Sequence, residues 1–242
     1  MTEVVRLDVE RNVATVTLDS PANRNALSRT LLEQLDARLR DALADDAVRV
    51  LVLSHTGSVF CSGADLKEPP GPDAPVSLPD VLNLLWTAPK PVVARVGGHA
   101  RAGGIGLLAA CDVAVAARDA TFAFSEVRLG VVPAIISLVT LPRLGHARAL
   151  ELYLTGDTFD GARAAEIGLV AAVADDVDAT VGDYVDKLRL GAPGALAATK
   201  RLLRAPLDFA ELERLSLQAF AGEEAREGMA AFAEKRAPRW AE

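Results

Sequence analysis

The sequence predicts an α/β fold in which a parallel sheet and its helices are followed by a helical C-terminal region. Continuous apolar runs at 48–54 and 91–96 are typical of strands that are buried on both faces, as in parallel sheets. An amphipathic helix at 31–43 precedes the first run, which gives the strand–helix–strand order of a parallel crossover. From residue 176 onward the chain shows only helical patterns. We therefore expect a core over 1–175 and a helical region over 176–242.

Composition limits the possible functions. At 242 residues and 25.4 kDa the chain can bury a core as one domain. Its net charge of −7 argues against a protein that binds nucleic acid or a membrane surface. Cys61 and Cys111 are too few for a disulfide scaffold, and no cysteine–histidine spacing suggests a metal site. Since neither a signal peptide nor a membrane span is recognisable, we expect a cytoplasmic protein.

The N-terminal elements follow from local patterns. Residues 4–9 and 13–18 alternate apolar and polar side chains, which predicts a β-hairpin. Ser28 is placed to cap the helix at 31–43. The strand at 48–54 then completes the crossover.

The middle of the chain alternates loops and helices. Residues 68–79 contain five prolines and are predicted to form a loop, with a short helix at 81–86 after it. Helices are predicted at 134–141 and 147–154, and a last strand at 169–173. Four further helices are expected at 176–190, 193–204, 208–220 and 223–235.

The stretch 90–130 is the most informative part of the chain. It is expected to form a strand, a glycine-rich turn, a helix and a second strand. Glycines allow the backbone to approach a ligand or another loop closely. The N–H groups that open the helix near Gly103 have no helical acceptor and can stabilise an anion. Glu126 lies a few residues beyond the second strand. Donors and one carboxylate together favour acid–base chemistry on a carbonyl compound.

A dinucleotide site is an alternative interpretation of the same glycines. Residues 104–109 match the pattern G-x-G-x-x-A, and Glu126 lies near the usual offset of a ribose-binding acid. Two details disfavour this alternative. Residues 97–103 separate the strand from the motif, and residues 121–125 separate the second strand from the acid.

A second loop favours the acyl-chemistry interpretation. Residues 61–65 follow the strand at 48–54, so this loop and the glycine turn are expected at the carboxyl edge of one sheet, where ligands bind in open α/β folds. If the backbone N–H groups of Ser62 and Gly103 converge, they form an oxyanion hole with two donors.

An ordered set of motifs resembles the enoyl-CoA hydratase/isomerase (crotonase) superfamily. The resemblance extends over about residues 12–173, with a further match at 234–236 near the C-terminus. The matching segments are 23–27, 60–66, 90–94, 103–104, 111–112, 125–133 and 154–156.

This resemblance implies a spiral of ββα units whose C-terminal helices take part in trimer packing. The assembly implied is a homotrimer or a dimer of trimers. The ligand implied is an acyl-CoA thioester, with coenzyme A carried as part of the substrate and no separate cofactor.

The resemblance also assigns roles to residues. The backbone N–H groups of Ser62 and Gly103 would hold the thioester oxygen, and Glu126 matches one of the two hydratase glutamates. Arg24 and Lys67 are candidates for binding the phosphates of CoA. The full set implied for substrate and CoA binding is Arg24, Ala26, Ser62, Gly63, Ala64, Asp65, Leu66, Lys67 and Gly103. Asp65 is equally suited to capping the following turn.

One position departs from the family pattern. The second hydratase glutamate belongs three residues after the oxyanion glycine, where this chain has Gly106. We expect this change to free space and to remove a negative charge, which would suit a branched or glutaconyl-type substrate. The segment 133–137 resembles the subgroup that acts on such substrates.

The resulting hypothesis is an enoyl-CoA hydratase. The alternatives are a Δ3,Δ2-enoyl-CoA isomerase, a carboxyacyl-CoA decarboxylase, and a non-enzymatic protein that binds acyl-CoA or acts as a scaffold.

Overall fold

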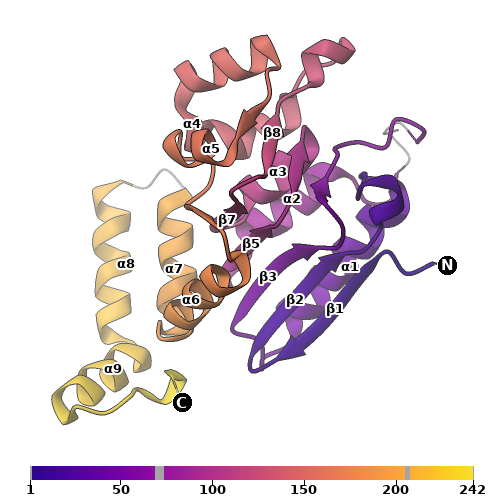
Figure 1. Cartoon of the computed structure of the whole chain (residues 1–242). Coiled ribbons are helices and arrows are strands. Elements are labelled where there is room, and N and C mark those ends of the chain that lie inside the picture. Colours follow the sequence, from indigo (N-terminus) through magenta and orange to yellow (C-terminus); the bar gives the residue numbers. More distant parts are fainter. Residues whose placement is uncertain (1, 69–73, 205–207, 242) are drawn as a thin grey trace.

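The computed structural model describes residues 2–68, 74–204 and 208–241, and these form two sheets surrounded by helices (Figure 1). The larger sheet has the strand order β1-β2-β3-β5-β7-β10. Its strands are β1 Val5–Glu10, β2 Val13–Leu18, β3 Val50–His55, β5 Val92–Val96, β7 Val113–Ala117 and β10 Ala172–Ala174. The predicted hairpin is confirmed, because β1 and β2 pair antiparallel while the other neighbours pair parallel.

A second sheet has the order β4-β6-β8-β9. Its strands are β4 Val59–Cys61, β6 His99–Arg101, β8 Thr121–Ala123 and β9 Phe159–Asp160. The sequence patterns did not predict this sheet, since strands of two or three residues are too short to show a period. Each of β3, β5 and β7 is followed first by a strand of the small sheet and then by helical chain, which confirms the expected ββα repeat.

The core helices pack on one face of the large sheet, on the small sheet or on one another. They are α1 Arg29–Ala44, α2 Leu78–Thr87, α3 Gly103–Ala110, α4 Ala134–Thr155 and α5 Gly161–Glu166. Ser28 caps α1 as predicted, with its hydroxyl accepting from Leu31 N–H at 3.3 Å. Gly145 interrupts α4 with φ 67° and ψ 165°, so the two helices predicted there are joined at a kink.

The start of α2 differs from the sequence prediction. It begins at Leu78, before the predicted start, because Ser77 and Asp80 form a capping box and Pro79 fits the first turn. Part of the predicted proline-rich loop, residues 69–73, lies outside the described residues.

Helix α6, Val177–Arg189, covers the opposite face of the large sheet. Its Val177, Val181 and Val185 pack against valines of the strands, among them Val52 and Val93. The first helix of the predicted C-terminal region is therefore part of the layered core.

Asp112, at the start of β7, joins the core to α7 (Pro193–Arg204). Its carboxylate accepts from Val92 N–H, Lys200 Nζ and Arg204 Nη2, each at 2.7 Å. Both cations are largely buried, so this cluster holds α7 at the N-terminal edge of the strands.

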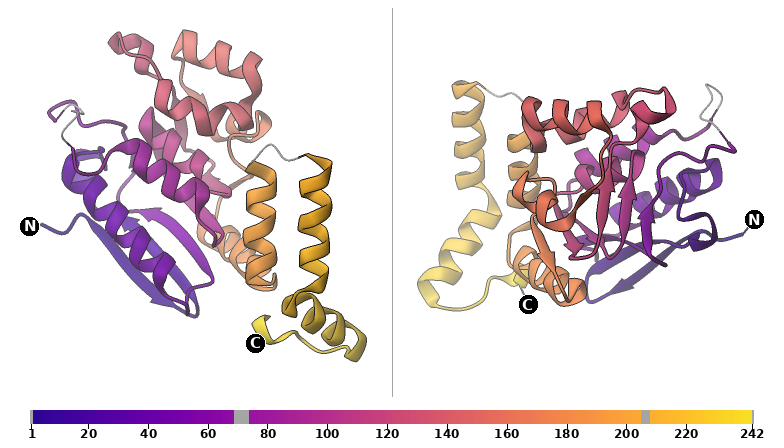
Figure 2. Two further views of the ribbon diagram at one scale, coloured as in Figure 1. Left: turned by 180° about the vertical axis from the view of Figure 1, so that it is seen from behind. Right: turned by 45° about the horizontal axis from the view of Figure 1, so that its top comes forward.

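Helices α8 (Phe209–Ala221) and α9 (Glu223–Glu234) project from the body of the molecule (Figure 2). Their apolar side chains are largely exposed, and α8 has no buried residue. None of the helices in the described part of the chain is long and apolar enough to cross a lipid bilayer.

Candidate active site

The glycine turn and the loop that follows β4 lie in contact. A Cβ atom placed on Gly103 would be 3.9 Å from Gly63 Cα, and one on Gly104 would be only 2.5 Å from the carbonyl oxygen of Cys61. Glycine at position 104 is therefore required for the close approach. The N-terminus of α3 is thus held against residues 61–63. The glycine turn and this loop are the two segments that the sequence predicted to form one site.

The first turn of α3 presents unused amide donors. The N–H groups of Gly103 and Gly104 have no acceptor among the described residues. Ala102, which precedes them, has φ 48° and ψ −119°, a conformation that costs alanine roughly 1–3 kcal/mol. Its carbonyl accepts from Ile105 and Gly106, which fixes the direction of the turn. Strain next to free donors is a feature of functional sites.

Ser62 is placed beside this turn, but its amide is not free. Its N–H donates to the carbonyl of Arg24 at 3.1 Å. Arg24 and Asn25 both have left-handed backbone conformations, with φ 59° and 51°. The buried Asn25 side chain holds this loop by donating to Thr56 O and Val59 O. The Ser62 amide can therefore serve a ligand only by sharing or exchanging its bond to Arg24.

Glu126 reaches the same region from the neighbouring strand. Strands β6 and β8 pair in parallel, so α3 and the 3₁₀ helix η2, Glu126–Leu129, leave the small sheet at one edge. Glu126 is 8% exposed, and its Oε2 is buried with no hydrogen-bond partner in the described structure. Burial raises the pKa of Glu126, and only a bond to its own amide opposes this. A buried carboxylate without a cation is a candidate base.

Tyr153 and Thr140 lie near the chain that leads to this carboxylate. The ring of Tyr153 lies 4.5 Å from that of Phe124, and its hydroxyl is hydrogen-bonded to Thr140 Oγ1. Burial raises the pKa of Tyr153, and the nearby charge of Glu126 raises it further. Tyr153 thus packs on Phe124, two residues before Glu126, and the sequence patterns gave no signal for it.

Several of the residues predicted to bind CoA lie at the surface, and these exposed residues are called the outer part of the candidate site. Arg24 and Lys67 are exposed, and no ion pair of either is found within the described chain. Asp65 accepts from Lys67 N–H at 3.0 Å. It therefore caps the following turn, which is the alternative to a direct role in binding that the sequence offered. Of the remaining residues, Ala64 and Leu66 are exposed, whereas Ala26 and Gly63 are buried.

Comparison with known proteins shows the family. The enoyl-CoA hydratase/isomerase family model matches residues 8–242. The chain belongs to the enoyl-CoA hydratase/isomerase family. A probable enoyl-CoA hydratase of Rhizobium meliloti is 36% identical, with 97% of this chain and 96% of the relative covered. The 2,3-dehydroadipyl-CoA hydratase of Escherichia coli is 34% identical, with 95% of each chain covered.

Solved structures agree with this family assignment. Pseudomonas aeruginosa AtuE has a TM-score of 0.91 at 35% identity, covering 99% of this chain and 100% of that one. A putative enoyl-CoA hydratase from Mycobacterium avium paratuberculosis has 44% identity and a TM-score of 0.77 over the same shares. The family predicted from the motifs is thus confirmed.

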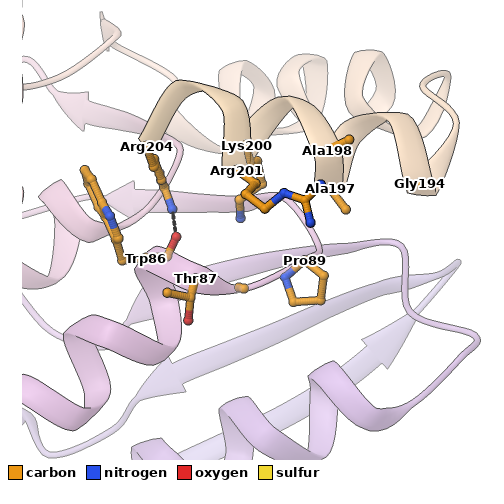
Figure 3. A pocket seen from close by; sticks show the side chains of 10 residues that line it. Trp86, Thr87, Pro89, Gly194, Ala197, Ala198, Lys200, Arg201 and Arg204 are labelled. Atoms are coloured by element: carbon orange, nitrogen blue, oxygen red, sulfur yellow. Dashed lines mark hydrogen bonds between the residues drawn. The ribbon is translucent and has the colours of Figure 1, made fainter. Parts of the chain in front are cut away.

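Within this family fold, a separate cavity of about 520 Å³ lies between the end of α2 and α7 (Figure 3). Leu78 at the start of α2 approaches Gly103, whereas Trp86 at its other end lines the cavity. Arg204 stacks on Trp86 and donates to its carbonyl. None of the lining residues is a carboxylate, so this cavity cannot supply the base.

The histidine and cysteine side chains of this region are hydrogen-bonded within the fold or buried. His99 Nδ1 accepts from Thr121 N–H at 3.1 Å. Cys61 and Cys111 are buried free thiols, each with its pKa raised by burial to about 12. Across the described ranges, no group of three or more His, Cys, Asp or Glu side chains is arranged to hold a metal ion.

Proposed function

We propose that this chain is an enoyl-CoA hydratase, which adds water across the C2=C3 double bond of an enoyl-CoA thioester. The observation that carries the proposal is the buried, unpaired Glu126 carboxylate on the sheet edge from which the free amides of α3 emerge. The names of the relatives support this activity, since several are named probable enoyl-CoA hydratases and one is named 2,3-dehydroadipyl-CoA hydratase.

In the proposed mechanism the thioester oxygen accepts from Gly103 N–H and from Ser62 N–H. Negative charge grows on this oxygen as the enolate forms, and each well-aimed donor contributes about 3–4 kcal/mol to its stabilisation. The Ser62 donor becomes available when its bond to Arg24 O is shared with the substrate.

Glu126 acts as the base and then as the acid. It takes a proton from water as the oxygen attacks C3, and the same proton returns to C2 as the enolate collapses. A raised pKa suits both steps, because the protonated form is then a usable donor near neutral pH. We further propose that Arg24 and Lys67 contact the CoA phosphates and that no separate cofactor takes part.

Mass spectrometry of reactions with a panel of enoyl-CoA thioesters tests this function. Hydration adds the mass of one water, decarboxylation removes that of carbon dioxide, and isomerisation leaves the mass unchanged but alters the retention time. The absence of a second carboxylate at Gly106 specifically favours isomerisation as the second candidate. Isomerised product without a hydrated one would replace the hydratase proposal by the isomerase.

The pH dependence of kcat/KM should report Glu126. Burial raises its pKa above the ordinary value of 4.5, and the base must be ionised. Activity is therefore expected to fall as the pH decreases through this raised pKa.

The raised pKa of Glu126 also predicts a pH-dependent difference in stability. The free energy of unfolding of the wild type should fall relative to that of Glu126→Gln as the pH rises through this pKa, because only the wild type must ionise a buried group. Urea unfolding of both proteins across this range measures the difference. If the difference in the free energy of unfolding between the two proteins does not change with pH, the raised pKa of Glu126 is contradicted.

The exposed C-terminal helices lead us to propose a homotrimer or a dimer of trimers. Phe209, Phe220 and Phe232 are 90%, 69% and 87% exposed, and faces of this kind mark interfaces. Light scattering at micromolar concentration is expected to give a mass of three or six chains. A monomeric mass would contradict this prediction. Replacing Phe209 and Phe220 by serine should lower the mass, whereas replacing the exposed Leu66 should not.

A further inference from the structure

The position of the missing glutamate is filled by an isoleucine. A Cβ atom placed on Gly106 would lie 2.6 Å from Ile136 Cγ2 and 3.2 Å from Ile136 Cβ, with Leu82 Cδ1 at 3.5 Å. Ile136 comes from the first turn of α4 and is 3% exposed. The expectation that Gly106 frees space is therefore wrong, because a side chain from another element occupies that space.

A series of contacts connects this face of α4 with Phe124, two residues before Glu126. Thr140 lies one turn after Ile136 and donates to its carbonyl at 2.7 Å. Thr140 is also hydrogen-bonded to Tyr153, which packs on Phe124, two residues before the carboxylate. Ile136, which packs against Gly106, is thus linked through Thr140, Tyr153 and Phe124 to the chain that leads to Glu126.

Neither Arg128 nor Arg143 forms an ion pair with Glu126 in the described structure. Glu126 Oε2 has no partner, and Arg128 is engaged by Thr155 O and Asp157. Arg143, on α4, donates to the carbonyls of Ala109 and Cys111, at the far end of α3. A second carboxylate brought here by a substrate would be buried beside Glu126 without a counter-ion, which is strongly unfavourable.

We propose that Gly106 and Ile136 act as one steric unit that selects thioesters with a neutral, apolar acyl group and excludes those with a terminal carboxylate. This inference rests on the proposed function, since it assumes that the acyl group lies beside Glu126. It replaces the glutaconyl-type substrate expected from the sequence.

Binding of unreactive saturated thioesters separates specificity from catalysis. Butyryl-CoA, isovaleryl-CoA and glutaryl-CoA are titrated into the wild-type protein by calorimetry. Butyryl-CoA is expected to bind at least about tenfold more tightly than glutaryl-CoA, because only the latter buries an unpaired charge. Equal or tighter binding of glutaryl-CoA would overturn the inference, as would no binding of any of them at millimolar concentration. Selective binding without hydration of enoyl-CoAs would contradict the proposed function alone.

Variants of Ile136 test the residue itself. Ile136→Ala should raise the affinity for isovaleryl-CoA relative to butyryl-CoA about fivefold, by opening room beside Gly106. Ile136→Val should move the ratio in the same direction while keeping most of the packing. Ile135→Ala is the matched control, since Ile135 is adjacent but half exposed, and it should leave the ratio unchanged. A ratio that neither Ile136 variant moves would overturn the proposal.

The steric contact can also be measured without a ligand. Gly106→Ala should lower Tm in wild type, and lower it less in the Ile136→Ala background, where Cγ2 is gone. Equal decreases in both backgrounds would show that the two residues are not one unit.

Discussion

Glu126→Gln is expected to lower kcat by about 10²–10⁴-fold, the contribution of a positioned general base. Glutamine has nearly the same shape but cannot accept the proton of water. Asp65, the other carboxylate assigned to the site, accepts from Lys67 N–H and caps a turn, and Gly106 supplies no carboxylate. The fold should persist, because Oε2 makes no hydrogen bond that the substitution would break. Initial rates with an enoyl-CoA that the panel shows to be hydrated measure the loss.

Two control variants sharpen this test. Glu126→Asp keeps the charge but shortens the side chain, so an intermediate loss would show that position matters as well as charge. Glu68→Gln removes an exposed carboxylate near the outer part of the site and should change kcat less than twofold. A Glu126→Gln enzyme that keeps more than about a tenth of the wild-type kcat would exclude Glu126 as the base.

Gly104→Ala is expected to damage stability and activity together. The new Cβ would lie 2.5 Å from Cys61 O and 2.8 Å from Cys61 Cβ, and a backbone carbonyl cannot rotate away as a side chain can. Overpacking of this kind costs about 1–3 kcal/mol. The contact also sets the distance between α3 and the Ser62 loop, and a displacement of about 1 Å can lower the rate by about 10². Urea unfolding and kcat measure the two effects.

Gly182→Ala is the matched control for this substitution. Gly182 lies in α6 with nothing within 4 Å of an added Cβ, and its φ is not positive. Alanine should therefore stabilise the helix by roughly 0.5–1 kcal/mol and leave the rate unchanged. If Gly104→Ala is as stable and as active as Gly182→Ala, the close approach of α3 to the Ser62 loop is not required.

Sequence alone determined the features that depend on near neighbours in the chain. The buried strands, the Ser28 cap and the N-terminal hairpin follow from short-range patterns, and the structure has each of them. The ordered motifs also identified the family.

Only the tertiary structure decided what fills the space between elements. The Ser62 amide is bonded to Arg24, and Ile136 occupies the space beside Gly106, although 38 and 30 positions separate these pairs in the sequence. The small sheet likewise forms because strands of two or three residues are brought together by the large one. Such contacts depend on how α4 and the 24–25 loop pack. The presence of Gly106 in a motif therefore does not show that Ile136, from a different helix, occupies the space beside it.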